Sequence, residues 1–499
     1  MNYTAINIGP IIKTLSLARR PRELWSASYM FSYLMECIVN KVKEKECTII
    51  APIIGGKPKV SVGLYPDRLY FSHGDNTSLD VEQILSDAWG EFQKEVFDQN
   101  INCRDYFNLM HVTLQFEGQS HSVILAKLND YLDLLELCAF AVNPQDGTKD
   151  PLENVYELIA KRNESPLVEN STGNANMNME TLAEIAAAQL ADVAGEEWNV
   201  FEKNNRDENY TDDPYSVFRS LKEYKSYHRY FCVVQADGDN MGKTVTSPNL
   251  LDEQLTNVSK GLWDYGKEAS KLINDYGGKA IYAGGDDLLF IAPVVGKDGN
   301  NIFGLLKKIE GEFNSKIKKV VEDEFENESD APSLSFGVAI AYYKHPLYEV
   351  LESARNLLFS VAKGGNVKNK VAWRLEKHSG ETFSACYSKL DKGLDEAFKN
   401  LIEQTADGNT VSAVAHKLKL NWTLLEKCLE ADKENKGISR LDSLFAKMLE
   451  ASEGNSYFSA VKEVVLKLYP AKDITNLADV LYTMLRTAKF IKGEDTKDE

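Results

Sequence analysis

Cysteine and histidine are scarce in this chain of 499 residues. The seven cysteines are scattered and never form a C-x-x-C pair, which argues against a four-cysteine zinc site and fits a reducing compartment. The seven histidines never occur as His-Asp or as H-E-x-x-H, so no histidine-based metal nuclease is visible. The sequence also lacks the roughly 18 consecutive apolar residues of a membrane helix and the ordered regions of a signal peptide. We therefore expect a cytoplasmic protein without a membrane partner.

Positive charge is in deficit. The chain has 57 Lys and Arg against 75 Asp and Glu, a formal net charge of −18, and such a chain is repelled by nucleic acid at long range. If RNA is a partner, a local groove or other subunits must supply the positive charge. The content of 43% hydrophobic and 26% charged residues is that of a soluble globular protein, and the length predicts about three or four domains.

The N-terminal third alternates between strand and helix patterns. Their order is β-α-β-β-α-β, which is typical of a ferredoxin-like fold. Pro21 precedes the first helical stretch, and proline favours the start of a helix. The predicted strands are 3–18, 47–52, 68–72 and 110–116, and the predicted helices are 23–43 and 80–98.

The same order returns from residue 227. The predicted strands are 227–236, 279–283, 288–293 and 333–343, the predicted helices are 252–276 and 301–326, and a further helix (347–363) and strand (370–375) follow. We infer two copies of one fold, an internal duplication whose residue-by-residue similarity has faded.

The remaining segments are helical or irregular. The stretch 170–180 has the composition of a linker, 181–193 is Ala-rich and predicted to be helical, and no strand signal remains from about 385 to 490. The sequence therefore predicts an α+β protein in four parts. They are a first ferredoxin-like domain without a metal site (1–145), a helical or loop insert without zinc cysteines (146–225), a second ferredoxin-like domain (226–380) and a C-terminal helical bundle (381–499).

The second copy carries Gly284, Gly285, Asp286 and Asp287 between two predicted strands. The glycines permit a tight hairpin and a close approach of backbone to a ligand. Two adjacent carboxylates repel each other unless a cation lies between them, and Mg²⁺ favours a few carboxylates together with substrate phosphates. The alternative is a solvated turn, because Gly and Asp are common turn residues.

A second acidic sequence follows the first strand of the same copy. Asp237, Gly238 and Asp239 stand there, and Lys243 follows. In a sheet of this order the first strand lies beside the hairpin, so Asp237 can face the Asp286–Asp287 tip. Three such carboxylates suit two metal ions in phosphoryl transfer, with the Gly238 carbonyl as a further ligand. An Asx turn is the alternative, whereas an EF-hand is disfavoured because no Glu-terminated twelve-residue frame follows.

Two lysines are candidates for phosphate contacts. Lys363 ends the predicted helix 347–363 and is followed by two glycines. That arrangement is typical of a helix C-cap, but in a nucleotide pocket the lysine neutralises triphosphate oxygens. Lys243 fits a surface position as well as it fits a phosphate ligand.

The segment 230–375 resembles the cyclase palm of the large subunit of type III CRISPR RNA-guided complexes, most of all its type III-B (Cmr) form. RELWSASYMFSYLME (22–36) resembles the first palm of that family. The strings that carry the resemblance in the second palm are VVQADGDNMGK (233–243), IYAGGDDLLFIAP (281–293), SFGVAIAYYKHPLYEVLESARNLL (335–358) and AK (362–363).

The resemblance implies a nucleotidyltransferase that uses ATP and Mg²⁺ or Mn²⁺ to make a nucleotide second messenger, usually cyclic oligoadenylate, when the complex binds target RNA. It implies other complex subunits as partners, among them the small helical subunit, which we expect the C-terminal region to dock, and the crRNA-bearing backbone. crRNA and target RNA would be reached through the complex. The implied catalytic residues are Asp237, Asp286 and Asp287, the implied metal ligands are these three and Gly238, and the implied nucleotide-binding residues are Gly284, Gly285, Asp239, Lys243 and Lys363.

The sequence departs from many members of the family in two ways and from diguanylate cyclases in a third. It shows neither a His-Asp nuclease pair nor cysteines in the insert, so we expect no DNA cleavage and no zinc. Val367 stands where diguanylate cyclases have an arginine. The first copy has Gly55 and Gly56 but no Asp pair, and Asp67 is the only carboxylate of its hairpin. The acceptor therefore stays open: a second ATP, or another adenosine-containing molecule such as S-adenosylmethionine. A stand-alone GGDEF-like cyclase and a scaffold with a vestigial palm are further alternatives.

Overall fold

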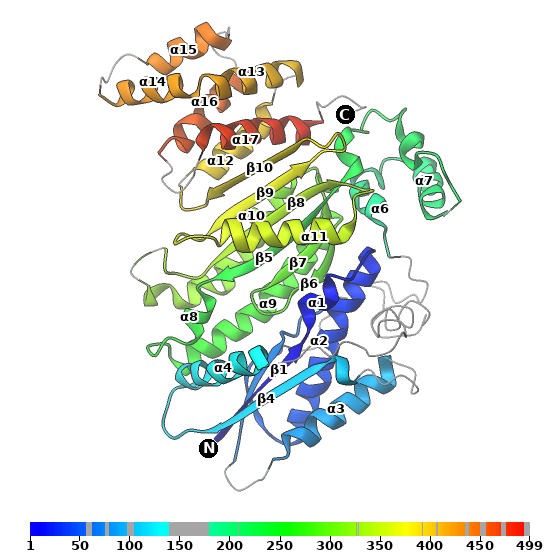
Figure 1. Ribbon diagram of the computed structural model, residues 1–499, viewed down its shortest axis with the longest axis vertical. Helices are drawn as coiled ribbons and strands as arrows, with labels where there is room; N and C mark the ends of the chain where they lie inside the picture. The colour runs from blue at the N-terminus through cyan, green and yellow to red at the C-terminus, as the bar shows by residue number, and fades with distance from the viewer. Residues whose placement is uncertain are drawn as a thin grey trace.

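The computed structural model describes residues 1–55, 62–74, 79–96, 104–138, 179–207, 209–325, 327, 329–391, 393–405, 408–434, 439–449, 456–470 and 476–493. The chain is elongated, with one sheet at its N-terminal end, a second sheet in the middle and the C-terminal helices at the far end (Figure 1). Most of the predicted linker 170–180 and the first part of the predicted insert lie outside the described residues. Within those residues, no helix is long and apolar enough to cross a membrane.

The first sheet has the strand order β2-β3-β1-β4, with all its pairings antiparallel. This is the order of a ferredoxin-like fold, so the predicted fold of the first copy is confirmed. The predicted strand 3–18 is wrong beyond Gly9, because Pro10 has no N–H for the ladder and precedes a short helix. The elements are β1 (Asn2–Gly9), α1 (Ile11–Leu15), α2 (Pro21–Glu44), β2 (Thr48–Ala51), β3 (Arg68–His73), α3 (Val81–Val96), β4 (Asn108–Gln115) and α4 (His121–Cys138).

The second sheet has the order β10-β9-β8-β5-β7-β6. Its four strands β8-β5-β7-β6 repeat the order β4-β1-β3-β2 of the first sheet, which confirms the predicted duplication. The added strand β9 runs parallel to β8 and β10 returns antiparallel to β9. The elements are β5 (Tyr230–Asp239), α8 (Met241–Val245), α9 (Asp252–Tyr276), β6 (Lys279–Tyr282), β7 (Leu288–Pro293), α10 (Ile302–Lys316), β8 (Ser333–Tyr342), α11 (Leu347–Asn356), a π-helical turn (Leu357–Ala362), β9 (Lys370–Glu376) and β10 (Thr382–Ser388).

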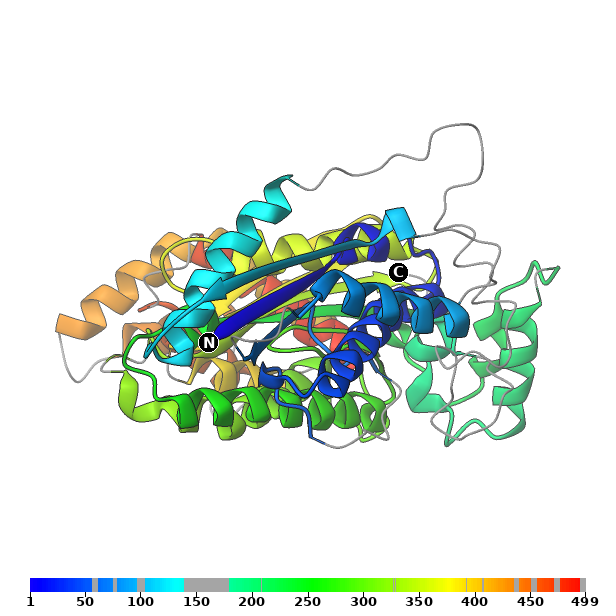
Figure 2. The ribbon, with the colours of Figure 1, turned by 90° about the horizontal axis from the view of Figure 1, so that it is seen from below.

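Both faces of the second sheet are covered. Cys232 and Val234 of β5 pack in the core that contains α9 and α10, whereas Phe231 and Val233 pack in the core that contains α2 and α11. A central strand covered on both faces is apolar throughout rather than alternating, which is why the run of apolar residues in β5 predicted a strand so clearly. In the view of Figure 2, α9 runs below the first sheet. This helix contacts β2 and α4 on one side and β6 and β7 on the other, so it packs against both parts.

Further predicted elements differ from the observed ones. The helix predicted at 301–326 ends at Lys316, and a 3-10 segment (Lys318–Glu324) follows, within which the backbone of Val321 is not helical. The helix predicted at 181–193 is reduced to α6 (Leu182–Ala186) and a 3-10 turn (Ala188–Leu190), and α7 (Glu196–Arg206) completes this part. The prediction that the chain is purely helical from residue 381 is wrong at its start, because β10 extends the second sheet to Ser388.

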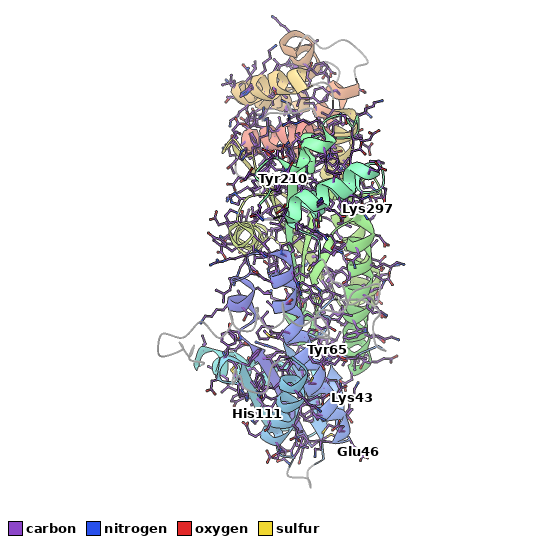
Figure 3. All side chains as sticks on the ribbon, turned by 90° about the vertical axis from the view of Figure 1, so that its right-hand side faces the viewer. Lys43, Glu46, Tyr65, His111, Tyr210 and Lys297 are labelled. Carbon is purple, nitrogen blue, oxygen red and sulfur yellow. The ribbon has the colours of Figure 1, made fainter. Side chains whose placement is uncertain are left out.

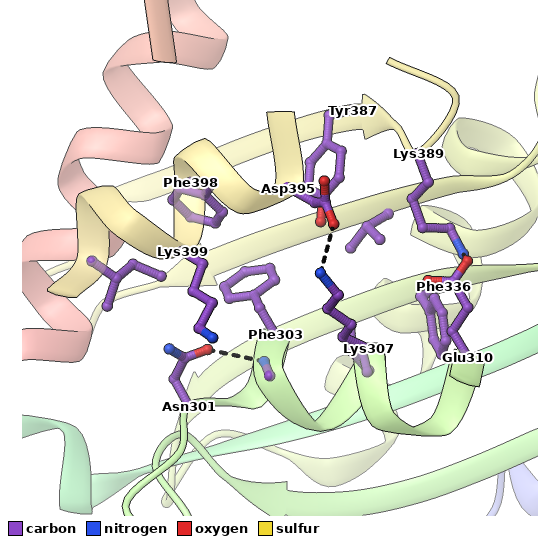
Figure 4. Close-up of a pocket in the computed structure, with 14 residues that line it drawn as sticks. Asn301, Phe303, Lys307, Glu310, Phe336, Tyr387, Lys389, Asp395, Phe398 and Lys399 are labelled. Carbon is purple, nitrogen blue, oxygen red and sulfur yellow. Dashed lines mark hydrogen bonds and ion pairs between the residues drawn. The ribbon is translucent and has the colours of Figure 1, made fainter. Parts of the chain in front are cut away.

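The C-terminal helices are packed on the second sheet rather than set apart from it. The Trp373 ring of β9 lies against Phe303 of α10 and Phe398 of α12, and its indole N–H donates to Thr487 of α17 at 3.1 Å. A small pocket at this junction is lined by residues of both parts (Figure 4). The helices are α12 (Leu394–Gln404), α13 (Gly408–Leu420), α14 (Trp422–Glu434), α15 (Arg440–Leu449), α16 (Ser456–Leu468) and α17 (Leu477–Lys492).

Candidate nucleotide and metal site

The predicted site residues lie at one end of the second sheet. β5 pairs with β8 along its whole length, so Asp237 stands opposite Ser335 and Asp239 opposite Ser333. On its other side β5 pairs with β7 as far as Ala236 opposite Leu288. One residue further along this antiparallel register, Asp237 reaches the level of Asp287. The sheet therefore brings together the two acidic sequences, which are 49 residues apart along the chain.

The Gly-Gly-Asp-Asp sequence forms the turn between β6 and β7. The Asp287 N–H donates to the Gly284 carbonyl at 3.3 Å. Gly285 has a φ of +67°, a conformation that glycine adopts without strain, and a Cβ at Gly284 would lie 2.4 Å from the Tyr282 hydroxyl oxygen. Both glycines thus have a steric reason to be present, beside their predicted role in nucleotide binding.

Gly238 brings the backbone of β5 against the turn. A Cβ at this position would lie 2.6 Å from Oδ2 of Asp286 and 2.5 Å from Cγ of Met241. Real Cβ atoms do not approach other atoms so closely, so only glycine fits here without a shift of its neighbours. The absence of a side chain at Gly238 therefore allows the Asp286 carboxylate to lie next to the backbone of β5.

The Lys363 ammonium lies between the acidic groups at the end of β5. Its Nζ atom is 2.5 Å from Oδ2 of Asp237, donates to the Gly238 carbonyl at 2.8 Å and is 3.6 Å from Oδ1 of Asp239. Only 12% of the Lys363 side chain is exposed. The carboxylate of Asp237 and the carbonyl of Gly238, two predicted metal ligands, thus converge on a single cation.

The π-helical turn fixes the place of Lys363. The Lys363 N–H donates to the Leu358 carbonyl, five residues back, at 2.8 Å, and π-helical turns are frequent at functional sites. Gly337 of β8 lies under this turn, and a Cβ there would be 2.3 Å from the Ala354 carbonyl oxygen. Lys363 forms the C-cap of this turn, so the predicted capping geometry is present, and the side chain is directed to the carboxylates at the same time.

Asp239 is completely buried and organises the backbone around it. Its Oδ2 accepts hydrogen bonds from the hydroxyls of Ser333 and Ser335, at 3.0 and 2.6 Å, and from the Asn369 N–H at 2.9 Å. Asn369 belongs to the loop that follows Lys363. These contacts give Asp239 the geometry of a positioning residue, whereas its predicted role was direct nucleotide binding.

The electrostatics of the turn favour a bound cation. The surrounding protein removes water from the Asp286 carboxylate and so raises its pKa to about 7, and the negative charge of Asp237 raises this pKa further. The negative charges of Asp237, Asp286 and Asp67 also raise the pKa of the exposed Asp287 above its ordinary value. Burial raises the pKa of Asp237 as well, and the Lys363 ammonium opposes this shift. The unfavourable proximity of these charges is relieved when a divalent cation joins them.

The donor set fits a cation that is also held by substrate. Among the described residues, no three His, Cys, Asp or Glu side chains already form a complete set of metal ligands. Mg²⁺ does not require such a set, because proteins commonly bind it through one or two carboxylates and leave the other positions to water and phosphate. Carboxylate and carbonyl oxygens are also ligands that Mn²⁺ accepts. Lys243, by contrast, is exposed on α8, so the structure places it at the surface.

The first sheet contributes a segment that sequence analysis assigned to no role. Residues 62–67 precede β3 and lie against the turn of the second sheet, where the Gly63 carbonyl accepts a hydrogen bond from the Ala283 N–H at 2.9 Å. Pro66 is near Gly285, and the charge of Asp67 acts on both Asp286 and Asp287. Tyr65, which belongs to this segment and is labelled in Figure 3, packs edge to face on Trp263 of α9, with ring centroids 5.2 Å apart.

Comparisons with known proteins agree with this architecture. Residues 230–372 match the model of the second palm domain of Cas10/Cmr2, and residues 3–97 match the N-terminal model of the CRISPR-associated protein Cmr2. A curated relative, the CRISPR system Cmr subunit Cmr2 of Pyrococcus furiosus, is 33% identical over a segment that covers 33% of this chain and 20% of the relative. The match thus spans about a fifth of that relative's length.

Solved structures share the fold at low sequence identity. A chain of the type III-B Cmr-beta complex in its apo state aligns with a TM-score of 0.59 at 13% identity, over 99% of this chain and 82% of that one. A chain of the Csm1-Csm4 cassette in complex with pppApApA aligns with a TM-score of 0.53 at 13% identity, over 98% and 69%.

The fold and the two family matches define a protein of two palm domains with its acidic residues at the end of the second sheet. Residues 230–372 match the second palm domain of the Cas10/Cmr2 family of CRISPR-associated proteins, and residues 3–97 match the N-terminal domain of Cmr2. The predicted resemblance is therefore confirmed, and the roles of the individual site residues stay predictions.

Proposed function

We propose that this chain is a nucleotidyltransferase that attaches the adenylyl group of ATP to a hydroxyl acceptor and releases pyrophosphate. The observation that carries the proposal is the convergence of Asp237 and the Gly238 carbonyl on one cation, with the Asp286–Asp287 turn beside them. Such a site at the end of a palm sheet is suited to phosphoryl transfer, which depends on positioning and charge neutralisation more than on covalent chemistry of the protein.

Divalent cations, Mg²⁺ or Mn²⁺, supply charge neutralisation of the triphosphate and a lower pKa of the acceptor hydroxyl when they are bound. Asp237, Asp286 and Asp287 would hold them together with the Gly238 carbonyl. Lys363 would turn from Asp237 to the phosphate oxygens when the cations arrive. Asp239 keeps the Lys363 loop in place through its bond to the Asn369 N–H.

We further propose that the chain acts as the large subunit of an RNA-guided type III complex and makes cyclic oligoadenylate on target RNA binding. A chain of similar fold belongs to a Cmr-beta complex bound to cognate target RNA, and it aligns with this chain with a TM-score of 0.56 at 13% identity. The net charge of −18 supports a role in which partner subunits supply most of the RNA contacts. The C-terminal helices would dock the small helical subunit.

The acceptor is a separate question from the donor. Residues 62–67 of the first palm lie against the turn and include no Asp pair, and we propose that the acceptor binds on this side. A second ATP is the acceptor we propose, and S-adenosylmethionine is the second candidate because its adenosine offers the same 3′-hydroxyl. Incubation of the RNA-activated complex with ATP alone separates the two: cyclic oligoadenylate supports the first, and release of pyrophosphate only after metabolites are added supports the second.

The proposed transferase activity is tested with D286A/D287A. The matched control is E322A/D323A, which removes two exposed carboxylates from the 3-10 segment after α10. We expect the first variant to assemble with its partners and to lose product, and the control to keep wild-type activity. Wild-type product formation by D286A/D287A would show that the site assignment is wrong. A bare homodimer with activity and without crRNA would favour a stand-alone cyclase.

A further inference from the structure

A cavity lies on the outer strands of the second sheet, between the π-helical turn and the start of α17. Its volume is about 400 Å³. β9 and β10 form its floor, Leu357 and Val361 of the turn form one wall, and Asn476 and Val480 form the other. α17 runs beside β10 (Figure 1), so the cavity is enclosed by three parts of the fold that are far apart in sequence.

Lys370 lines this cavity from the start of β9 with an ammonium group that has no partner. Only 8% of Lys370 is exposed. Its backbone N–H donates to the Ser335 hydroxyl oxygen at 3.2 Å, but no described residue forms a hydrogen bond or an ion pair with its Nζ atom. Burial raises the pKa of the Cys386 thiol in the same lining to about 11, and the nearby Lys370 charge opposes this rise. A charge that is buried without a partner costs free energy, and an anion in the cavity would remove that cost.

Arg374 adds a second positive charge to the floor. It stands four residues after Lys370 on the same strand, and side chains that are an even number of residues apart share one face of a sheet. Its Nε donates to Ser384 Oγ at 3.1 Å, and within the part of the chain that the structure describes no carboxylate pairs with its guanidinium. Asp479, the one carboxylate in the lining, is 2.6 Å from Lys419. The lining therefore has an excess of positive charge.

The π-helical turn separates this cavity from the candidate nucleotide site. The turn lies over Gly337 of β8, and β8 stands between β5 and β9 in the sheet. Lys363 extends from the turn to Asp237 on the β5 side, whereas Val361 and Gly364 line the cavity on the β9 side. None of the three predicted catalytic carboxylates lines the cavity. The two sites thus share one wall and have separate interiors.

We propose that this cavity binds a small phosphorylated molecule, with the phosphate held by Lys370 and Arg374. Arginine donates two parallel hydrogen bonds to phosphate, and lysine supplies a compact charge. The Ser384 hydroxyl on the same floor is a further donor to phosphate oxygens. The apolar side chains of Leu357 and Val480 offer a surface to the organic part of the ligand. Sites for small molecules commonly combine such apolar walls with a few polar groups, in volumes of about 300–1,000 Å³.

A free small molecule fits this cavity better than single-stranded nucleic acid does. Proteins that bind single strands generally stack the bases on aromatic side chains. Tyr387 is the one aromatic residue in the lining, and its ring packs on Trp373 in the core on the other face of the sheet, with ring centroids 5.9 Å apart. The described lining therefore offers no aromatic ring to a base.

The proposal is tested with K370M and the matched control K43M. Both variants keep the length of the side chain and remove one charge, and Lys43 is an exposed lysine near the end of α2 (Figure 3). Binding of ADP and of inorganic pyrophosphate to the full chain is measured by calorimetry in chelator, which keeps divalent cations from the candidate nucleotide site. We expect K370M to bind each ligand at least about tenfold more weakly than the parent, because hydrogen bonds to charged groups are strong. K43M should bind as the parent does.

The two ligands distinguish two sources of the phosphate. Tighter binding of ADP identifies a nucleotide, and equal binding identifies an inorganic phosphate compound. Absence of binding to the parent at millimolar concentrations of both ligands would overturn the proposal, and so would equal losses in K370M and K43M. A greater loss in K363M than in K370M would place the ligand in the candidate nucleotide site. Competition by an unstructured RNA oligonucleotide that exceeds competition by ADP, compared per phosphate group, would identify nucleic acid as the ligand and also overturn the proposal.

Urea unfolding gives a second measurement of the same ammonium. Without ligand, K370M should be at least as stable as the parent, because the exchange removes a buried charge that lacks a counter-charge. ADP should raise the unfolding midpoint of the parent and leave that of K370M unchanged. Lower stability of K370M without ligand would show that the ammonium has a structural role, which contradicts the proposal. None of these outcomes depends on the transferase activity.

Discussion

Replacement of Lys363 by methionine tests the part of the site that holds a cation. The variant K363M keeps the length of the side chain and removes the ammonium from Asp237 and the Gly238 carbonyl. The Lys363 and Asp237 side chains are 12% and 20% exposed, and that of Asp239 is fully buried. Loss of one partner of a buried ion pair costs about 3–5 kcal/mol, and the partial access of solvent to Asp237 reduces this to about 2–4 kcal/mol.

The assay compares urea unfolding of K363M and of the parent chain, first in chelator and then with Mg²⁺ or Mn²⁺. In chelator the midpoint of K363M should fall, because Asp237 loses its counter-charge. A divalent cation can take the vacated place without displacing an ammonium. The gain in stability on addition of metal should therefore be larger for K363M than for the parent, following the ordinary linkage between binding and folding.

K243M is the matched control for this experiment. Lys243 is exposed on α8 and has the same side chain, so its loss should leave the free energy of unfolding within about 0.5 kcal/mol of the parent value. An equal midpoint for K363M and K243M in chelator would contradict the reasoning. So would a metal-induced gain that is the same for K363M and the parent, because Asp237 and the Gly238 carbonyl would then not form the cation site.

Two further predictions concern single positions. G238A should lose about 1–3 kcal/mol of stability and most product formation, because a Cβ there would overlap Met241 and Asp286. G242A is the control in the same region, since no atom lies within 4 Å of the corresponding Cβ; similar behaviour of both variants would refute the steric argument. For His228, burial lowers the pKa to about 3 from an unfolded value near 6.5. The stability that His228 contributes should therefore be present above about pH 6.5 and be lost at ~1.4 kcal/mol per pH unit as the pH falls toward 3. H228Q should lack that component in urea unfolding followed from pH 7 to pH 4, and an identical pH dependence of the two proteins would contradict the assignment.

Local sequence patterns predicted most of the palm elements. The strands β6 and β7 and the helix α9 were predicted almost to the residue, because their apolar periods are strong and Gly and Asp mark the turn between the strands. The strand order followed from the element order, since a β-α-β-β-α-β sequence has few packed solutions. β10 was missed because the residues that follow it have helical periodicity, and the predicted helical bundle was therefore begun too early.

Contacts between distant segments were beyond reach of the sequence. Lys363 was recognised as a helix end and as a phosphate ligand, but its bond to Asp237, 126 residues away, requires the fold. The same is true of Asp239, whose predicted contact was a nucleotide and whose observed partners are two serines and a backbone amide.

The two palms differ at the candidate site, where each contributes a different part. In the second sheet β5 ends in Asp237, Gly238 and Asp239, whereas the corresponding strand β1 ends at Gly9 and carries no such carboxylates. The first sheet instead extends the connection between β2 and β3, and residues 62–67 of that connection lie on the Gly-Gly-Asp-Asp turn of the second. A Cβ at Gly63 would lie 2.9 Å from Cβ of Ser32 on α2, so this segment is held between α2 and β6. The second copy of the duplicated fold thus carries the turn with the acidic groups, and the first copy carries a segment that packs against this turn. Selectivity for the acceptor would then be altered through residues 62–67, without any change to Asp237, Asp286 or Asp287.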